Sequence, residues 1–194
     1  MIRKPEGYEN APIYGTGDFE NVTPGGHICR IRAVKEEISN GNRQLVIAFD
    51  LAETDAQAGY YAKQYSQRVS SDVNAKWPGV YRQGIDGKSM PFFKGLITAI
   101  ERSNPGYLWD WDENSLKGKL FGGVFGREEY MGTDGKPRWS CKVRSVRSIE
   151  GIEEAPVPED KPLQQTQQPS YGSYAVAAQA PQRSGGIGAT DLPF

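Results

Sequence analysis

The chain has 194 residues, enough for one domain with a tail but hardly for two domains of ordinary size. Its 23 Lys and Arg nearly balance its 24 Asp and Glu, which excludes a uniformly polybasic binder and leaves local charged patches open. Its 4 Trp, 10 Tyr and 7 Phe exclude a wholly disordered chain, while its 23 Gly and 13 Pro indicate a β-rich body diluted by loose segments.

The first residues, 1–6, lack the apolar stretch of a secretory signal, and no run approaches the ~20 apolar residues of a membrane-spanning helix. We therefore expect a cytoplasmic protein without a membrane partner. Cys29 and Cys141 form no C-x-x-C pair, and with His27 they are too few for a zinc site. The sequence predicts no metal and no cofactor, and both thiols are expected to behave as small apolar residues.

The first predicted hairpin spans residues 27–51. One face of its first strand, at 27–38, carries Cys29, Ile31 and Ala33. The other face carries Arg30, Arg32 and Val34. Asn40-Gly41 is a typical two-residue hairpin turn, and alternating apolar residues then predict the second strand at 45–51.

Two helices and a short strand are predicted next. Residues 54–68 suggest a helix with Thr54 as its N-cap. A short strand at 80–83 and the turn Asp86-Gly87 follow. Residues 91–102 have the clearest helical pattern, and Asn104-Pro105-Gly106 ends it. The apolar stripe of this helix consists of Phe92, Phe93, Leu96, Ile97 and Ile100.

Residues 119–130 and 138–149 flank a Thr-Asp-Gly-Lys turn at 133–136 and predict a second hairpin. Five strands, with a helix before the last hairpin, predict a mainly β fold with one or two helices. This arrangement is compatible with a five-stranded Greek-key barrel of the OB-fold type, and also with other small α+β folds. We expect residues 1–155 to form this domain.

The composition changes near Ala155. Residues 156–194 are dominated by Pro, Gln, Ala, Gly and Ser and show neither a helical nor a strand period. Such a segment buries too little apolar surface to offset its ordering entropy. We predict a disordered tail over 156–194.

Catalytic motifs are weak. Gly87-Lys88-Ser89 resembles the end of a P-loop, but Arg82 occupies the position of the required first glycine. An acidic loop offers oxygen ligands for a divalent cation, from Asp110, Asp112 and Glu113. A solvated loop between two Trp residues explains these acids as well. Since His27 has no Ser or Cys nucleophile arrangement, we expect no enzymatic activity.

Cations interleave with apolar residues on the predicted strands. Between residues 117 and 147, eight Lys and Arg oppose three acidic residues, a local excess of five positive charges. On the last strand Arg138, Lys142 and Arg144 alternate with Trp139, Cys141 and Val143. We expect the apolar set in the core and the basic set on a groove, with Arg30 and Arg32 repeating this pattern. Grooves of this kind bind single strands through phosphate contacts and stacked rings.

The rings expected to stack on bases are Trp77, Tyr81, Phe121 and Phe125, with core packing as the alternative for each. Trp77 and Tyr81 flank Pro78-Gly79, while Phe121 and Phe125 share a predicted face with Lys119 and Arg127. Trp109 and Trp111 lie among acids that repel phosphate and are weaker candidates. The candidate DNA-binding residues are therefore Arg30, Arg32, Trp77, Tyr81, Lys119, Phe121, Phe125, Arg127, Arg138, Lys142 and Arg144.

The chain ends in Asp191-Leu192-Pro193-Phe194 after a Gln-, Pro- and Gly-rich linker. This ending resembles the tip of bacterial single-stranded DNA-binding proteins, and the body looks like the divergent members of that family from phages and mobile elements. The similar stretches of the body are residues 47–53, 76–79 and the hairpin at 118–146. The bacterial tip usually carries several acids, whereas Asp191 stands alone here, which predicts weaker or more selective recruitment.

The resemblance implies an OB-fold body that binds and protects single-stranded DNA, without strong sequence preference, during replication, recombination and repair in a bacterial cell or phage-infected host. It also implies that the tip recruits a helicase, primase, polymerase or recombinase. Homo-oligomerisation is compatible with this interpretation. Two alternatives stay open: a strand-annealing or recombination mediator, and a protein-interaction adaptor with no role on DNA.

Overall fold

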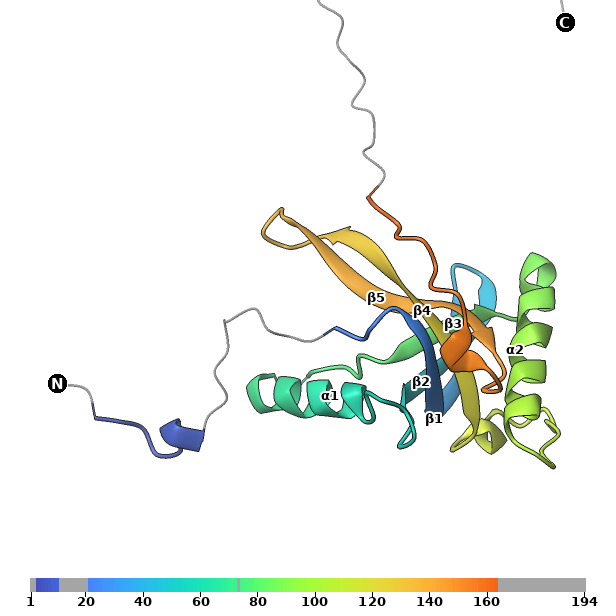
Figure 1. Ribbon diagram of the computed structural model, residues 1–194, viewed down its shortest axis with the longest axis horizontal. Helices are drawn as coiled ribbons and strands as arrows, with labels where there is room; N and C mark the ends of the chain where they lie inside the picture. Colours follow the sequence, from blue (N-terminus) through green and yellow to red (C-terminus); the bar gives the residue numbers. More distant parts are fainter. Residues whose placement is uncertain (1–2, 11–20, 73, 164–194) are drawn as a thin grey trace, which may run out of the picture. The chain divides into compact units, whose positions relative to one another are not determined.

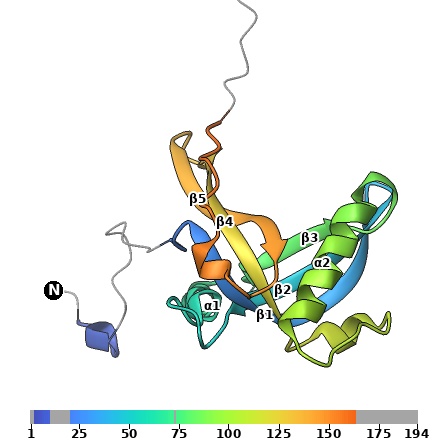
Figure 2. The ribbon, with the colours of Figure 1, turned by 45° about the vertical axis from the view of Figure 1, so that its right-hand side comes forward.

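The computed structural model describes residues 3–10, 21–72 and 74–163 (Figures 1 and 2). Its main feature is one antiparallel five-stranded sheet with the order β3-β2-β1-β4-β5. The strands are β1 (Gly25–Ser39), β2 (Asn42–Leu51), β3 (Val80–Gly84), β4 (Leu120–Met131) and β5 (Pro137–Arg147). The α-helices are α1 (Tyr60–Ser71) and α2 (Met90–Ser103). Short 3-10 helices lie at η1 (Tyr8–Asn10), η2 (Gly87–Ser89), η3 (Glu113–Leu116) and η4 (Ile152–Glu154). The predicted mainly β fold with two α-helices is confirmed.

The sheet is open between its two edge strands, β3 and β5. The closed five-stranded barrel suggested by the sequence is therefore not what the described strands form. β3 has only 5 residues, and side chains of α1, β3 and β5 line a groove at this seam instead of a paired ladder.

Both predicted hairpins are present. Asn40 and Gly41 have φ values of 51° and 76°, the left-handed conformations that a type I′ turn requires, and Ser39 pairs with Asn42. β4 and β5 pair up to Met131 and Pro137, on either side of the predicted turn. The helix predicted at 91–102 is α2, and Asn104 is its C-cap as expected.

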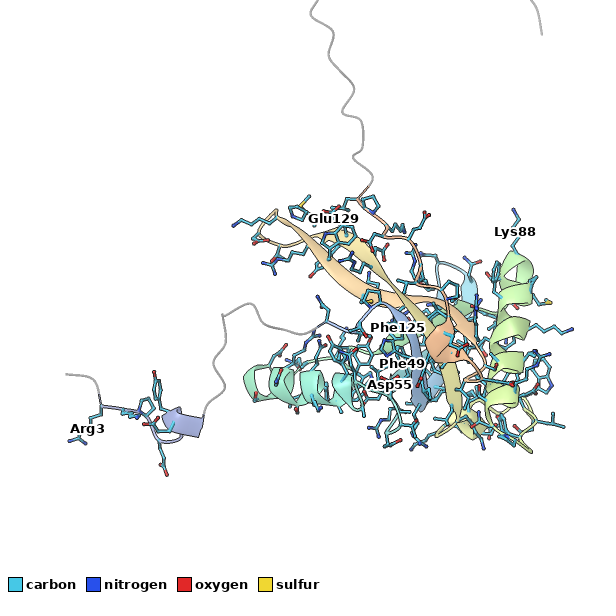
Figure 3. The ribbon with its side chains drawn as sticks, in the orientation of Figure 1. Arg3, Phe49, Asp55, Lys88, Phe125 and Glu129 are labelled. Atoms are coloured by element: carbon cyan, nitrogen blue, oxygen red, sulfur yellow. The ribbon has the colours of Figure 1, made fainter. Side chains whose placement is uncertain are left out.

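Aromatic rings occupy the centre of the core (Figure 3). The Phe49 ring meets those of Tyr61, Phe121 and Phe125 edge-to-face, with centroid distances of 5.2, 5.6 and 6.2 Å. α2 adds a buried stripe of Phe93, Leu96, Ala99 and Ile100. Phe92 was also expected in this stripe, but that prediction was wrong because its side chain is 72% exposed.

Two β-bulges change which side chains face the core. In β1, Ile31 pairs with Phe49 but Ala33 pairs with Ala48, so Arg32 is an extra residue in the ladder. Ala33 is consequently exposed and Val34 packs against the core, the reverse of the simple alternation. In β5, Arg144 is the corresponding extra residue, between the partners of Val124 and Phe125. The predicted alternation therefore holds only up to each bulge.

The first helix begins later than predicted and has a different cap. α1 starts at Tyr60, so Thr54 is not its N-cap. Asp50, 1% exposed on β2, instead accepts hydrogen bonds from the backbone N–H groups of Tyr61 (2.9 Å) and Ala62 (3.2 Å). A buried carboxylate from a neighbouring strand thus satisfies donors of the first helical turn.

After β5 the chain returns to β4 (Figure 1). Ile152 is 2% exposed and packs with Val124 of β4. Its backbone also lies so close to Gly26 of β1 that a Cβ at that position would be 1.6 Å from the Ile152 carbonyl oxygen, so the contact requires glycine. Farther on, Lys161 exchanges backbone hydrogen bonds of 2.9 and 3.0 Å with β4. The first residues of the expected tail, 156–163, thus belong to the unit that ends at Leu163, while 164–194 lie outside the described residues. No helix in the described part of the chain is long and apolar enough to span a membrane.

Candidate nucleic-acid interface

A groove of about 550 Å³ lies at the open seam of the sheet, between α1, β3 and β5. We call it the seam groove. Its six rings are those of Phe49, Tyr60, Tyr61, Tyr81, Tyr130 and Trp139. Its cations are Arg68, Arg82 and Lys142. Because no Asp or Glu is among the described residues that line it, the groove combines aromatic surface with positive charge.

Contacts hold the rings of the α1 and β3 walls in place. The Tyr60 hydroxyl accepts a hydrogen bond from Gln64 Nε2 (2.6 Å), and its ring lies 5.0 Å from that of Tyr61, edge-on. The Tyr81 hydroxyl donates to Gln83 Oε1 (3.0 Å). Burial raises the pKa of both Tyr60 and Tyr81, so neither brings negative charge into the groove.

Tyr130 and Trp139 present the most accessible rings of the groove, at 41% and 39% exposed. The Arg127 guanidinium lies 5.7 Å from the centre of the Trp139 ring, a cation–π distance. The prediction that Trp139 lies in the core was wrong. β1 pairs with β4 only as far as Phe125, so the outer part of the β4–β5 hairpin projects beyond β1 (Figures 1 and 2).

Three of the five candidate DNA-binding cations of this hairpin are paired with carboxylates. The ion pairs are Arg127–Asp160 (2.6 Å), Arg138–Asp134 (3.0 Å) and Lys142–Glu128 (3.3 Å). Exposed pairs of this kind are weak and can exchange a carboxylate for a phosphate. Arg144, at the β5 bulge, forms no ion pair with a described residue. Lys142 is the predicted cation that lines the seam groove.

The other predicted cations lie outside the seam groove. Arg30 pairs with Glu53 (2.7 Å), and Arg32 pairs with the buried Asp50 (3.3 Å). Lys119 lies 4.2 Å from the centre of the Tyr107 ring. Arg32 therefore neutralises the carboxylate that caps α1, a structural contribution.

The predicted rings also separate into different roles. Tyr81 lines the groove, but Phe121 and Phe125 are 0% exposed and cannot stack on a base, so that prediction was wrong. Both face Phe49 because β4 turns its apolar side inward. For Phe121 and Phe125 the alternative prediction, packing in the core, is therefore the correct one.

Trp77 supports a wall of the groove without lining it. Its indole N–H donates to the Phe49 carbonyl (2.9 Å), and its ring lies 5.3 Å from that of Tyr65. At Gly79 a Cβ would lie 2.4 Å from the same carbonyl and 2.7 Å from the Tyr61 ring. Residues 76–79, which lead into β3, thus pack tightly against β2 and α1.

Sequence reasoning missed Tyr60, Arg68, Arg82 and Tyr130 as groove residues. The position of Arg82 could have been inferred from the sequence, because it is next to Tyr81, a candidate DNA-binding residue, on the predicted strand at 80–83. Tyr60 and Arg68 carried none, because only the packing of α1 beside β3 brings them to the seam.

The sole histidine and both thiols take part in internal packing. His27 Nδ1 lies 3.1 Å from Asp55 Oδ1, and its Nε2 lies 2.8 Å from the Thr23 carbonyl oxygen. Burial opposes charging of His27, but these hydrogen bonds outweigh it and raise its pKa. Burial raises the pKa of Cys29, and that of Cys141 to about 11, so both thiols stay protonated near neutral pH.

Two carboxylates of the acidic loop accept hydrogen bonds from backbone and side-chain groups of the same loop. Asp110 accepts a hydrogen bond from the Ser115 hydroxyl (2.9 Å), and Asp112 accepts one from the Asn114 N–H (2.9 Å) at the start of η3. Across the described ranges, no three His, Cys, Asp or Glu side chains gather in a way that could hold a metal ion. These contacts favour the solvated-loop interpretation.

No model of a known protein family matches the chain, and no curated protein matches it. The tip residues Asp191, Leu192, Pro193 and Phe194 lie outside the described residues.

Proposed function

We propose that this protein binds and protects single-stranded DNA, which lies in the seam groove, and that its C-terminal tip recruits a replication or recombination partner. The observation that carries the proposal is the composition of the groove. Six rings and three cations line it, and no carboxylate is among its described lining residues.

The accessible rings of Tyr130 and Trp139 are suited to stacking on bases. Each stacked base contributes about 1–3 kcal/mol, and every base offers a π-face, so such binding has little sequence preference. Arg82 is exposed and forms no ion pair with a described residue, so a phosphate can approach it without displacing a carboxylate. Affinity should therefore fall as salt rises.

We also propose that the fold is an OB barrel opened at one seam. The order β3-β2-β1-β4-β5 leaves β3 and β5 as the pair that closure would join, and α2 separates β3 from β4 in the chain. OB folds bind oligonucleotides around strands 2 and 3 and the loops between strands 1 and 2 and between strands 4 and 5. The seam groove, with β3 on one wall and the β4–β5 hairpin on another, agrees with that location.

In this proposal the protein is a binder and not an enzyme. Both thiols are held protonated, and both ring nitrogens of His27 are occupied by Asp55 and Thr23. These groups are therefore poorly placed to act as nucleophile or base.

The proposed recruitment rests on the last residues of the sequence. Burying the Phe194 ring in a partner's pocket would contribute about 1.5–3 kcal/mol. A charge-assisted hydrogen bond from the tip to a partner's Lys or Arg would add about 1.5–3 kcal/mol. The partner class suggested by the resemblance is a helicase, primase, polymerase or recombinase.

A salt-series anisotropy titration tests the DNA-binding proposal, with labelled oligo-dT and a duplex of equal length. We expect tight binding of the single strand at low salt, weaker binding of the duplex, and affinities that fall with salt. Absence of oligo-dT binding at low salt would sink the proposal and favour the adaptor alternative. Deleting residues 191–194 should leave these curves unchanged and abolish binding of the partner. Accelerated pairing of complementary strands would favour the annealing alternative.

A further inference from the structure

A second aromatic surface lies in the segment between α2 and β4, which we call the Trp loop (residues 104–116). Its Trp111 side chain is 77% exposed and its Leu108 side chain is 80% exposed. Neither residue lines the seam groove. Trp111 is also in ring contact with Trp109, and adjoining exposed aromatic surface indicates an interaction site.

The structure holds Trp111 outward. Its ring packs on that of Trp109 with a centroid distance of 4.7 Å, and the Trp109 ring in turn meets Phe93 of α2 edge-on at 5.6 Å. The Trp109 backbone N–H donates to Glu101 Oε1 (3.0 Å), and its indole N–H donates to the Asp112 carbonyl (3.0 Å). Trp111 itself has a φ of 69°, a conformation that disfavours bulky residues and is kept here by the surrounding contacts.

The Trp loop is negatively charged. Asp110, Asp112 and Glu113 lie in it, and no Lys or Arg occurs between residues 103 and 116. None of these three carboxylates forms an ion pair with a described residue. Lys119, which follows the loop in the chain, lies 4.2 Å from the centre of the Tyr107 ring. Phosphate is repelled by such a surface, so a nucleic acid is a poor occupant.

We infer that the Trp loop docks a basic segment of a partner protein. An Arg or Lys of that segment lies on the free face of the Trp111 ring, and neighbouring cations meet Asp110 and Glu113. Charge complementarity selects this occupant, since the exposed Trp111 ring lies in the same short segment as three carboxylates that form no ion pair with a described residue. The Trp loop and the seam groove share no lining residue, so the inference goes beyond DNA binding and does not depend on it.

The test uses the full chain and two synthetic peptides. One alternates Lys and Arg with Leu and Val, and the other replaces every Lys and Arg with Glu. We expect calorimetry to detect binding of the basic peptide only, weakened about tenfold by Trp111→Ala because the cation–π contact is lost. Phe92→Ala is the matched control, since it removes an equally exposed ring from α2 and should leave binding unchanged.

Charge is tested separately with Asp110→Asn combined with Glu113→Gln, which keeps the Trp111 ring. This variant should weaken binding of the basic peptide and reduce its salt dependence. The inference would be overturned if the chain bound both peptides or neither. It would also be overturned if Trp111→Ala bound the basic peptide as tightly as the natural chain does. A dimer in sedimentation experiments that Trp111→Ala dissociates would also overturn it, because the occupant would then be a second copy. Oligo-dT binding by the same variants should be unchanged, so failure here is distinguishable from failure of the DNA proposal.

Discussion

The seam groove and the Trp loop both present indole and phenol rings, yet their charges are opposite. The groove places its rings beside Arg68, Arg82 and Lys142, with no acid among its described lining residues. The Trp loop places Trp109 and Trp111 among three carboxylates, and its one ring with a cation–π contact is that of Tyr107, against Lys119, within the described residues. Exposed rings supply contact area for many partners, whereas the surrounding charge selects among them. Under the two proposals above, one body offers separate surfaces to a polyanion and to a polycation.

The largest expected effect comes from removing the cap of α1, which forms one wall of the seam groove. Asp50→Ala leaves the N–H groups of Tyr61 and Ala62 without their acceptor, and should lower the free energy of unfolding by about 2–4 kcal/mol. Urea denaturation followed by circular dichroism measures this loss. Glu53→Ala is the control, because its exposed carboxylate pairs with Arg30 at the surface and its removal should leave stability nearly unchanged. Equal losses in both variants would contradict a capping role for Asp50.

Charge reversal in the groove should give the next largest effect, measured on DNA binding. Arg82→Glu combined with Lys142→Glu is expected to weaken oligo-dT binding about 10–100-fold at low salt, because two phosphate contacts become repulsive. Arg102→Glu on α2, outside the groove, serves as the control and should change affinity little. Anisotropy titrations in low salt compare the three proteins. If Arg102→Glu weakened binding as much as the double variant, DNA would not be confined to the groove.

Removing one ring distinguishes the two surfaces directly. Trp139→Ala should weaken oligo-dT binding about fivefold, since a half-exposed ring loses its stacking contact with one base. Trp111→Ala should leave oligo-dT binding unchanged, because acids surround that ring. The same titration measures both. A loss on Trp111→Ala without a loss on Trp139→Ala would reverse the assignment of the two surfaces.

The smallest expected effect is a pH dependence of the free energy of unfolding. It arises from His27, near the start of β1, and Asp55, in the loop before α1. The pKa of His27 is raised from 6.5, so its contribution to stability is present below 6.5 and is lost as pH rises through the raised value. Burial opposes ionisation of Asp55, but hydrogen bonds from His27, Gln57 and Ile28 outweigh it and lower its pKa from 3.8. The contribution of Asp55 is present above 3.8 and is lost as pH falls through the lowered value.

The His27–Asp55 pair should therefore stabilise the fold most between these limits. Thermal melts across pH should show a modest fall in Tm as pH rises above 6.5 in the natural chain, and His27→Gln should flatten it. A slope that persists in His27→Gln would assign the dependence to another group. Peptide binding at the Trp loop should not follow this titration, since the loop contains no histidine.

The regular elements were largely predictable, because short-range patterns specify them. Asn40-Gly41 favours a type I′ turn whatever surrounds it, and the spacing of Phe93, Leu96 and Ile100 specifies the buried face of α2. The bulges at Arg32 and Arg144 were not predictable, since an extra residue leaves no mark in the polarity pattern. The bulge in β1 reversed the inward and outward assignment beyond it, which is why Ala33 and Val34 exchanged faces.

The structure brings some of the predicted DNA-binding residues to the seam groove and buries others. Tyr81 and Lys142 line the groove, whereas Phe121 and Phe125 lie in the core, because a strand shows which residues share a face but not whether that face is covered. Trp139 shows the opposite error, since its strand leaves the covered part of the sheet.

By itself, the sequence determined the two hairpins, the helix at α2, the loose composition after Ala155 and the opposite charges of the hairpin and the Trp loop. These features depend on neighbours within a few residues along the chain. Only the tertiary structure decided the open seam between β3 and β5, the Asp50 cap on α1 and the meeting of Tyr60, Arg82 and Trp139 around one groove. These features join residues far apart in the chain, and their positions depend on how the helices and strands pack together.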